Sequence, residues 1–238
     1  MPIVYDARLK VLMLTVLSSN GIRAVLLAAA PEFERASGHK LAITFNPANV
    51  LKQEIDAGLV FDVAILTPPV MDAAIAGGRI APASRHTLAR TGCGVAVLLG
   101  APKPDIATVE GFSQALVNAR SIAATRQGAS GMHFARVIER LGVVDAVASK
   151  IKWQAGGLTG ERAARGEVEL AVQLLSELKA VGGIDIAGPF PPELQEYAVM
   201  VAGIGANARE PAAAAALIAA LTSERTQPLL ARLGMEPA

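Results

Sequence analysis

The chain has 238 residues, of which 52% are hydrophobic and 18% are charged, and its formal net charge is +1. This length supports one large domain or two lobes, each with a substantial core. A nearly neutral chain without runs of Lys or Arg has no electrostatic surface for nucleic acid or an anionic membrane, so the expected partner is a small molecule.

Residues that often carry redox or metal chemistry are scarce. Cys93 is the single cysteine, which excludes an internal disulfide and any site with several cysteines. Its neighbourhood contains no activating base, so a buried apolar role is favoured over a nucleophilic one. The three histidines are scattered without metal-ligand spacing, so we expect neither a metal nor another cofactor.

The N-terminal residues 1–8 lack a basic start followed by an apolar segment and a small-residue cleavage site, so no secretory signal is predicted. Residues 9–17 are interrupted by Lys10 and Thr15 and are too few to span a bilayer. The expected location is cytoplasmic, or periplasmic if the sequence was trimmed. A permease partner is expected only for an exported protein, and no oligomeric state is indicated.

The first third of the chain alternates between short apolar runs and helical patterns, which is typical of a doubly wound α/β sheet. Ser18, Ser19 and Asn20 follow the first predicted strand, Asn49 follows the second and Thr67 the third. Because the carboxyl ends of such strands form the edge where ligands bind, these five residues are candidate ligand contacts. The alternative for each is a simple helix N-cap. Strands are predicted at residues 9–17, 41–45 and 61–66, and helices at 22–36, 50–57 and in a short segment ending at Gly77, with Pro31 kinking or restarting the first helix and Gly38 closing it.

Two long apolar strands, at residues 88–99 and 197–204, indicate that the chain leaves a first lobe and later returns to it. We expect residues 1–88 and 198–238 to form lobe 1 and residues 89–197 to form lobe 2, with a ligand cleft between them. The second lobe and the C-terminus contain predicted helices at residues 108–119, with Thr108 as the cap, and at 132–141, 159–165, 210–221 and 227–233, and predicted strands at 121–124, 150–154, 169–174 and 184–187.

Lobe 2 carries its own candidate contacts at a strand-to-helix junction. Arg126, Ser130 and Gly131 lie where an apolar run passes into a helix, and Gln173 ends an otherwise apolar strand and needs a polar partner. His133, one turn into that helix, is a candidate general base because its ordinary pKa is close to neutrality. The alternatives are a solvated arginine, a capping serine and a structural histidine.

Read in order, these segments resemble the type II periplasmic-binding-protein fold, and within it the molybdate-binding-protein-like group. The resemblance implies two Rossmann-like α/β lobes joined by two crossover strands, with a small anion held between them by hydroxyls, amides and helix N-termini. It places contacts on Ser18 to Asn20, on Ala48 and Asn49, on Ala129 to Gly131, and near Leu158 and Leu174. The residues that carry it are 17–22, 53–58, 61–65, 129–131, 167–177 and 229–235.

The chain also departs from the molybdate binders. They have a serine at the position of Asn20, a hydroxyl near Ala48 or Asn49, and a tyrosine at the position of Leu174. A tetrahedral oxyanion needs several hydroxyl or N–H donors, so these losses indicate a different ligand. Residues 173–176 and 183–192 instead look like a subgroup that includes aconitate isomerases, which shift a proton within an unsaturated tricarboxylate.

These observations lead to two main hypotheses. The first is binding of a small organic anion, a di- or tricarboxylate, between the lobes. The alternative is a carboxylate isomerase on the same scaffold, while binding of molybdate or tungstate for an ABC transporter is the less favoured third. A carboxylate ligand predicts guanidinium partners, for which Arg126 and Arg23 are available.

Overall fold

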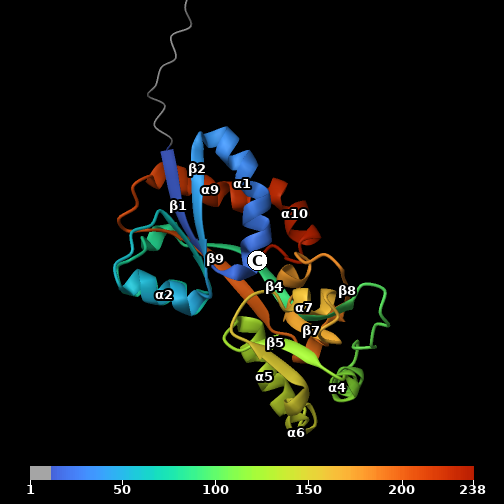
Figure 1. Ribbon diagram of the computed structural model, residues 1–238. Helices are drawn as coiled ribbons and strands as arrows, with labels where there is room; N and C mark the ends of the chain where they lie inside the picture. The colour runs from blue at the N-terminus through green and yellow to red at the C-terminus, as the bar shows by residue number, and fades with distance from the viewer. Residues whose placement is uncertain (1–11) are drawn as a thin grey trace, which may run out of the picture.

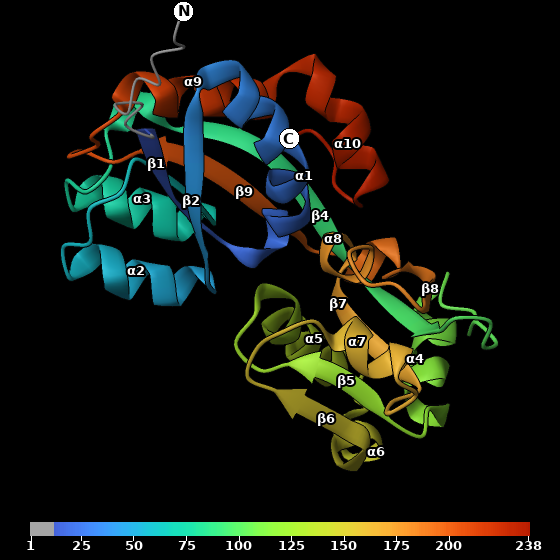
Figure 2. The ribbon, with the colours of Figure 1, turned by 45° about the horizontal axis from the view of Figure 1, so that its top comes forward.

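A computed structural model describes residues 12–238, which form two α/β lobes joined by two long strands (Figures 1 and 2). In each lobe, parallel strands form the centre of a sheet and helices cover its faces. Residues 9–11 of the first predicted strand lie outside the described residues. Within residues 12–238, no helix combines the length and the hydrophobicity needed to cross a membrane.

Lobe 1 is built on the parallel strand order β2-β1-β3. Gly38 ends helix α1 in the left-handed conformation at φ 73°, as its position predicted. The helix is continuous through Pro31, which costs one backbone hydrogen bond but does not restart it. The elements are β1 (Leu12–Ser18), α1 (Arg23–Ser37), β2 (His39–Phe45), α2 (Ala48–Asp56), β3 (Val63–Leu66) and α3 (Pro68–Ala76).

Lobe 2 repeats this plan with the parallel strand order β6-β5-β7. The Thr108 hydroxyl accepts a 3.0 Å hydrogen bond from the Gly111 N–H, which confirms Thr108 as the cap of α4. The helix expected to begin at Met132 begins at Ala129, so its first turn follows the strand more closely. The elements are α4 (Val109–Asn118), β5 (Ile122–Thr125), α5 (Ala129–Arg140), α6 (Val144–Val147), β6 (Ile151–Gln154), α7 (Thr159–Ala164), β7 (Leu170–Leu174), α8 (Leu175–Leu178) and β8 (Ile184–Pro189).

The two long strands β4 (His86–Leu98) and β9 (Tyr197–Ile204) cross between the lobes. Between His86 and Gly92, β4 pairs with β9, whereas from Cys93 onward it pairs with β7 and β8. β9 also pairs with β3, so a continuous path of hydrogen-bonded strands runs through both lobes. After β9, the helices α9 (Pro211–Thr222) and α10 (Gln227–Arg232) return to lobe 1 (Figure 2). Short 3-10 turns lie at Asn20–Ile22 (η1), Pro82–Ser84 (η2), Ala148–Lys150 (η3), Pro192–Leu194 (η4) and Glu224–Thr226 (η5).

Each lobe has its own hydrophobic core. In lobe 1, residues of β1 and α1 pack with Leu217 and Ile218 of α9, whereas Phe112, Phe134 and Phe190 anchor the core of lobe 2. The carboxylate of Asp62 is also buried, and it accepts hydrogen bonds from the backbone of Thr15 and from the residues that precede α9. Because both cores are closely packed, each lobe is a rigid body that positions the loops facing the other lobe.

Candidate functional site: the cleft between the lobes

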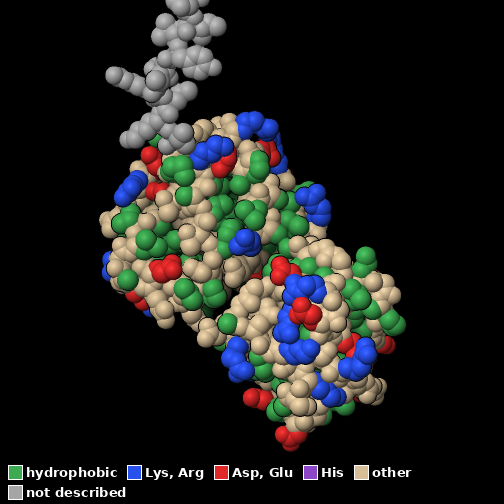
Figure 3. Space-filling view, in the orientation of Figure 1, with side chains coloured by type: hydrophobic (Ala, Val, Ile, Leu, Met, Phe, Trp, Pro, Cys, Tyr) green, Lys and Arg blue, Asp and Glu red, His purple; other side chains and the backbone are tan. Residues whose placement is uncertain are grey.

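A cleft of about 120 Å³ lies between the lobes, at the carboxyl ends of β1 and β3 on one side and of β5 and β7 on the other. Figure 3 shows the hollow between the two lobes. Polar atoms there come from hydroxyls, amides, backbone groups and one carboxyl group rather than from cations. The lining consists of Ser19, Asn20, Gly21, Pro47, Ala48, Asn49, Thr67, Thr125, Gln127, Gly128, Ala129, Met132, Ala155, Gly156, Gly157, Gln173, Leu174, Glu177 and Met200.

The starts of two regular helices, α2 and α5, line this cleft. Neither has a side-chain cap: Pro47 precedes α2 and Gly128 precedes α5. Because the first N–H groups of a helix lack intrahelical partners and carry the positive end of its dipole, both starts favour an anion. The helix after Thr67 differs, since Pro68 and Pro69 have no N–H to offer, so Thr67 contributes mainly its side chain.

Thr125, at the end of β5, is a site residue that the sequence analysis did not single out. Its side chain is buried, and its hydroxyl finds no hydrogen-bond partner within residues 12–238. A Cβ at Gly128 would lie 2.7 Å from this hydroxyl, and a Cβ at Gly131 would lie 1.6 Å from the Thr125 carbonyl oxygen. The two glycines therefore allow the end of β5 to approach the start of α5. A hydroxyl ending an apolar strand, as Ser18 does in lobe 1, was the available signal.

The three polar residues after β1 have different roles. Ser18 is fully buried outside the cleft lining, and its hydroxyl donates to the Ser19 carbonyl. The Ser19 hydroxyl lines the cleft but donates its proton to the Ile65 carbonyl at 3.0 Å, so it is left as an acceptor. The Asn20 side chain is half-buried, lines the cleft and has no hydrogen bond within the described part of the chain. Of the three, Asn20 is the available donor.

The candidate residues at the other strand ends also differ in whether they are free to contact a ligand. Asn49 and Thr67 line the cleft, Asn49 being exposed and Thr67 half-buried. Gln173 lines it too, but its oxygen accepts from the Thr159 N–H at 2.7 Å, and its nitrogen donates to the Gly157 carbonyl at 3.0 Å. Gln173 therefore holds the loop at residues 155–159, which forms part of the cleft wall.

The remaining candidates in lobe 2 lie outside the cleft lining. Ser130 is buried in the first turn of α5, and Gly131 permits the contact with Thr125 described above. Arg126 is exposed, with its guanidinium 5.5 Å from the centre of the Trp153 ring, and Arg23 lies over Phe45. In this arrangement, no Lys or Arg of the described chain lines the cleft.

His133 also lies outside the cleft lining, so its assignment as the general base stays a prediction that its position does not support. Its Nε2 is 2.7 Å from the Leu194 carbonyl oxygen, and its Nδ1 is 2.8 Å from a carboxylate oxygen of Glu196. The ring packs against Phe190, with 5.9 Å between ring centres. These contacts tie α5 to the segment that leads into β9, which is the structural role named as the alternative for His133.

The second residue missed from the sequence is Glu177, in the short helix α8. It is half-buried and is the only ionisable side chain among the described residues that line the cleft. Burial raises the pKa of Glu177 to about 7, against the opposing effects of the Leu174 backbone and the Gln173 side chain. Its position four residues after Gln173, just beyond a buried strand, was the signal that could have found it. The cleft thus holds one carboxyl group that titrates near neutral pH.

A family model for bacterial extracellular solute-binding proteins matches residues 14–236. The chain belongs to this family. A curated relative, aconitate isomerase from Pseudomonas sp., is 34% identical over 230 residues, which cover 94% of this chain and 87% of the relative.

Solved structures confirm the fold that the sequence predicted for this solute-binding protein. The periplasmic molybdate-binding protein of Azotobacter vinelandii has a TM-score of 0.78 at 21% identity, covering 94% of this chain and 99% of the other. The periplasmic binding protein AfuA of Actinobacillus pleuropneumoniae, with fructose-6-phosphate bound, has a TM-score of 0.69 at 16% identity, covering 94% and 85%. The resemblance to molybdate-binding-like proteins and to the aconitate isomerase subgroup is therefore confirmed.

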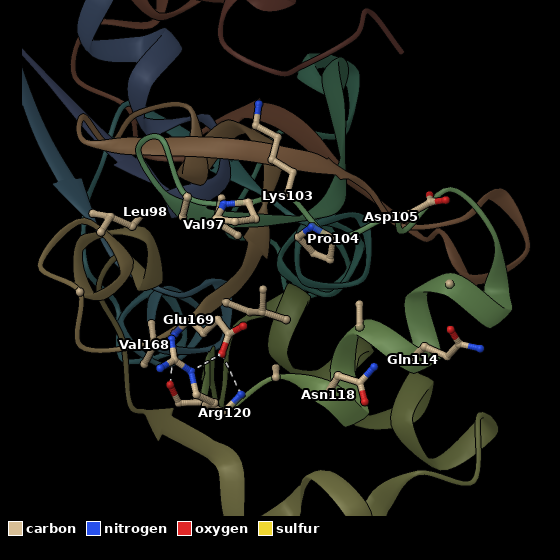
Figure 4. A pocket seen from close by; sticks show the side chains of 18 residues that line it. Val97, Leu98, Lys103, Pro104, Asp105, Gln114, Asn118, Arg120, Val168 and Glu169 are labelled. Carbon is tan, nitrogen blue, oxygen red and sulfur yellow. Dashed lines mark hydrogen bonds and ion pairs between the residues drawn. The ribbon is translucent and has the colours of Figure 1, made fainter.

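A larger groove of about 840 Å³ lies elsewhere on lobe 2 of this solute-binding protein (Figure 4). It is next to Ser121 and Glu169, which precede β5 and β7, and so lies at the amino ends of these strands. Arg120 and Glu169 form an ion pair in this groove, with 3.0 Å between Nε and Oε2, so their charges balance. Since ligands of open α/β sheets bind at the carboxyl ends of the strands, the smaller cleft is the better candidate.

Proposed function

We propose that this solute-binding protein binds a small organic anion, a di- or tricarboxylate, between its two lobes. The observation that carries the proposal is the buried, unpartnered Thr125 hydroxyl beside the uncapped start of α5. A buried hydroxyl without a partner costs about 1–3 kcal/mol, which a ligand oxygen accepting its hydrogen bond would offset.

The other donors of the cleft support a carboxylate rather than molybdate. The resemblance aligns Asn20 with a serine of the molybdate binders, Ala48 or Asn49 with a second hydroxyl, and Leu174 with a tyrosine, and all four residues line the cleft. An amide nitrogen offers two N–H donors, and the oxygens of a carboxylate accept such hydrogen bonds. If the protein is exported, a membrane permease is a candidate partner.

Thermal denaturation and titration calorimetry with trans-aconitate, cis-aconitate, citrate, succinate, molybdate and tungstate would test the proposal. We expect one or more of the carboxylates to raise the melting temperature and to give a saturable heat of binding. Stabilisation by molybdate or tungstate and by no carboxylate would overturn the proposal.

The variant Thr125→Val is the sharpest probe of the site. It replaces an unpartnered hydroxyl by a methyl group of similar size, so stability should be unchanged or raised, whereas affinity for the carboxylate should fall about tenfold. Thr87→Val, on the exposed part of β4 in lobe 1, is the matched control and should alter neither property. Unchanged affinity in Thr125→Val would remove Thr125 from the site.

A second candidate function is carboxylate isomerisation, favoured by the relationship to aconitate isomerase and by the ionisable Glu177 in the cleft. In such a reaction, a proton leaves the methylene carbon beside the double bond, the electron pair shifts across three carbons, and a proton adds at the far carbon. No co-reactant is needed, and a carboxyl with a pKa near neutrality can accept and return the proton.

Incubation with each isomer of aconitate, followed by separation of the two isomers over time, tests this second candidate. We expect wild-type protein to bring both mixtures to one common ratio and Glu177→Gln to lose that activity. Binding of both isomers without interconversion would reject isomerisation of these compounds and would leave the proposed binding function standing.

A further inference from the structure

We infer that Glu177 meets the bound anion as a neutral carboxylic acid, so that capture of each ligand is accompanied by uptake of a proton. The inference rests on the proposed binding function. It assigns to Glu177 a role in ligand selection, as the donor of a hydrogen bond to one carboxylate of the ligand.

Glu177 lines the cleft between the lobes. Its helix α8 packs against η1, which presents Asn20 and Gly21 to the cleft. The apolar side chains of Leu174 and Met200 line the same cleft and lie close to Gly21, since a Cβ on Gly21 would lie 3.2 Å from Leu174 Cδ1 and 2.7 Å from Met200 Cε. An ionised carboxylate in these surroundings would lose much of its hydration.

No ion pair of Glu177 occurs within residues 12–238, and Arg90, Arg162, Lys179 and Arg23 of the neighbouring segments make their contacts elsewhere. The Cys93 thiol of β4 stays neutral, because burial, reinforced by the charge of Glu177, raises its pKa to about 12. The other ionisable residues on elements packed against α8, together with the one that follows it, are His86 (exposed) and Arg90 (paired with Glu236) on β4, Arg23 (over Phe45), Glu32 (exposed), Glu34 (paired with Lys40) and Arg35 (exposed) on α1, Glu161 (exposed) and Arg162 (paired with Glu167) on α7, and Lys179 (on the Ala231 carbonyl).

An anion bound in this cleft places a second negative charge near Glu177. Two carboxylates in contact cannot both stay ionised without a cation, and one of them then holds a proton. Burial has already raised the pKa of Glu177 to about 7 in the empty cleft, so the proton is taken up at little cost near neutral pH. Once protonated, Glu177 donates a charge-assisted hydrogen bond to the ligand instead of repelling it.

A dependence of affinity on pH follows. Above the pKa of Glu177 in the free protein, each further pH unit should raise the dissociation constant about tenfold, because the proton must be supplied before the complex forms. Below that pKa, the affinity should level off. An ionised Glu177 that makes no contact with the ligand would give a far weaker dependence.

Titration calorimetry of the full chain with trans-aconitate, in two buffers of different ionisation enthalpy at pH about 7.5, counts the protons directly. We expect an uptake of between about half a proton and one proton per ligand. The dissociation constant should rise between pH about 6.5 and about 8.5, a range in which ordinary carboxyl groups of the ligand are ionised. Binding without proton uptake would overturn this inference alone, and the wild-type protein suffices for that test.

Glu177→Gln provides the matching variant, because its amide is neutral at every pH and still donates a hydrogen bond. We expect it to bind trans-aconitate with an affinity independent of pH and with no proton uptake. Glu161→Gln, on the exposed side of α7, is the control and should keep the wild-type uptake. If no carboxylate binds at any pH, the proposed function fails and this inference fails with it.

Discussion

The hydroxyl of Ser176, in lobe 2, donates a 2.7 Å hydrogen bond to the backbone carbonyl of Gly21, in lobe 1. The Ser176 N–H donates a 3.3 Å hydrogen bond to the hydroxyl oxygen of Thr91. The Thr91 hydroxyl in turn donates a 2.7 Å hydrogen bond to the Gly234 carbonyl. The turn that presents Asn20 is thus tied to the helix that presents Glu177. The same buried hydrogen bonds therefore hold both the lobe 1 side and the lobe 2 side of the cleft in place.

Ser176→Ala should lower the free energy of unfolding by about 1–3 kcal/mol, because the Gly21 carbonyl is left buried without its partner. It should also weaken carboxylate binding, since the turn and α8 are no longer held together. Denaturant unfolding and titration calorimetry would measure the two effects. Ser113→Ala, at a serine of α4 with no hydrogen bond in the described chain, is the control. Equal stability of the two variants would contradict the role given to Ser176.

Gly21→Ala should impair binding more than folding. The new Cβ would press on Met200 Cε and Leu174 Cδ1, which are the flexible ends of side chains, so the expected loss of stability is about 1 kcal/mol. The methyl group would nevertheless reduce a cleft of only about 120 Å³. We expect a clear loss of carboxylate affinity in calorimetry.

Gly131→Ala is the informative comparison, because its Cβ would meet the backbone oxygen of Thr125 at 1.6 Å and the start of α5 would have to move. It should lower the melting temperature far more than Gly21→Ala does. The reverse order of the two melting temperatures would show that the junction of β5 and α5 is less rigid than described.

The raised pKa of Glu177 also makes stability depend on pH. The folded protein holds the Glu177 proton up to about pH 7, whereas an unfolded chain releases it near the ordinary value of 4.5. Between these values the folded state binds more protons, so this group lowers the free energy of unfolding as the pH rises, and the decline ends above about pH 7. Denaturant unfolding of wild type and Glu177→Gln at several pH values should give curves that diverge across this interval. Parallel curves would contradict the assigned pKa.

Cys93 should resist chemical modification in the folded protein. It is buried, and its pKa is raised to about 12, so the reactive thiolate is scarce at neutral pH. Mass spectrometry after treatment with iodoacetamide at about pH 8 should find native protein unmodified and unfolded protein fully labelled. Rapid labelling of the native protein would show that β4 opens at this position.

Much of the fold could be predicted from local patterns. The strand at residues 197–204 has the predicted bounds, and the Thr108 cap and the Gly38 stop each depend on only a few neighbouring residues. The candidate site was harder to predict from the sequence. Whether a side chain is free to donate a hydrogen bond to a ligand depends on partners that lie far away in the sequence. Ser19 gives its proton to Ile65, 46 positions away, and Gln173 is occupied by Thr159, 14 positions away.

Orientation was the other missing information. Sequence spacing placed His133 near the start of a helix beside the cleft, but the helix turns this side chain toward Leu194 and Glu196. Thr125 and Glu177 were overlooked for the converse reason, since only the packed lobes reveal that one lacks a partner and that the other lacks a counter-charge. Residue types predict which chemical groups lie at a strand-to-helix junction. They do not predict whether a donor there is left without a hydrogen-bond partner.

The double crossing of the chain between the lobes has a consequence for how the protein is made. β3 has β9 as its second neighbour, and the core of lobe 1 includes Leu217 and Leu230, so lobe 1 lacks a strand and two helices until the last part of the chain leaves the ribosome. Lobe 2 lies within one uninterrupted stretch between the crossings. Synthesis therefore supplies the complete second lobe while the first is still an open sheet with an unpaired strand, and that exposed edge is the point at which a nascent chain most needs protection from aggregation.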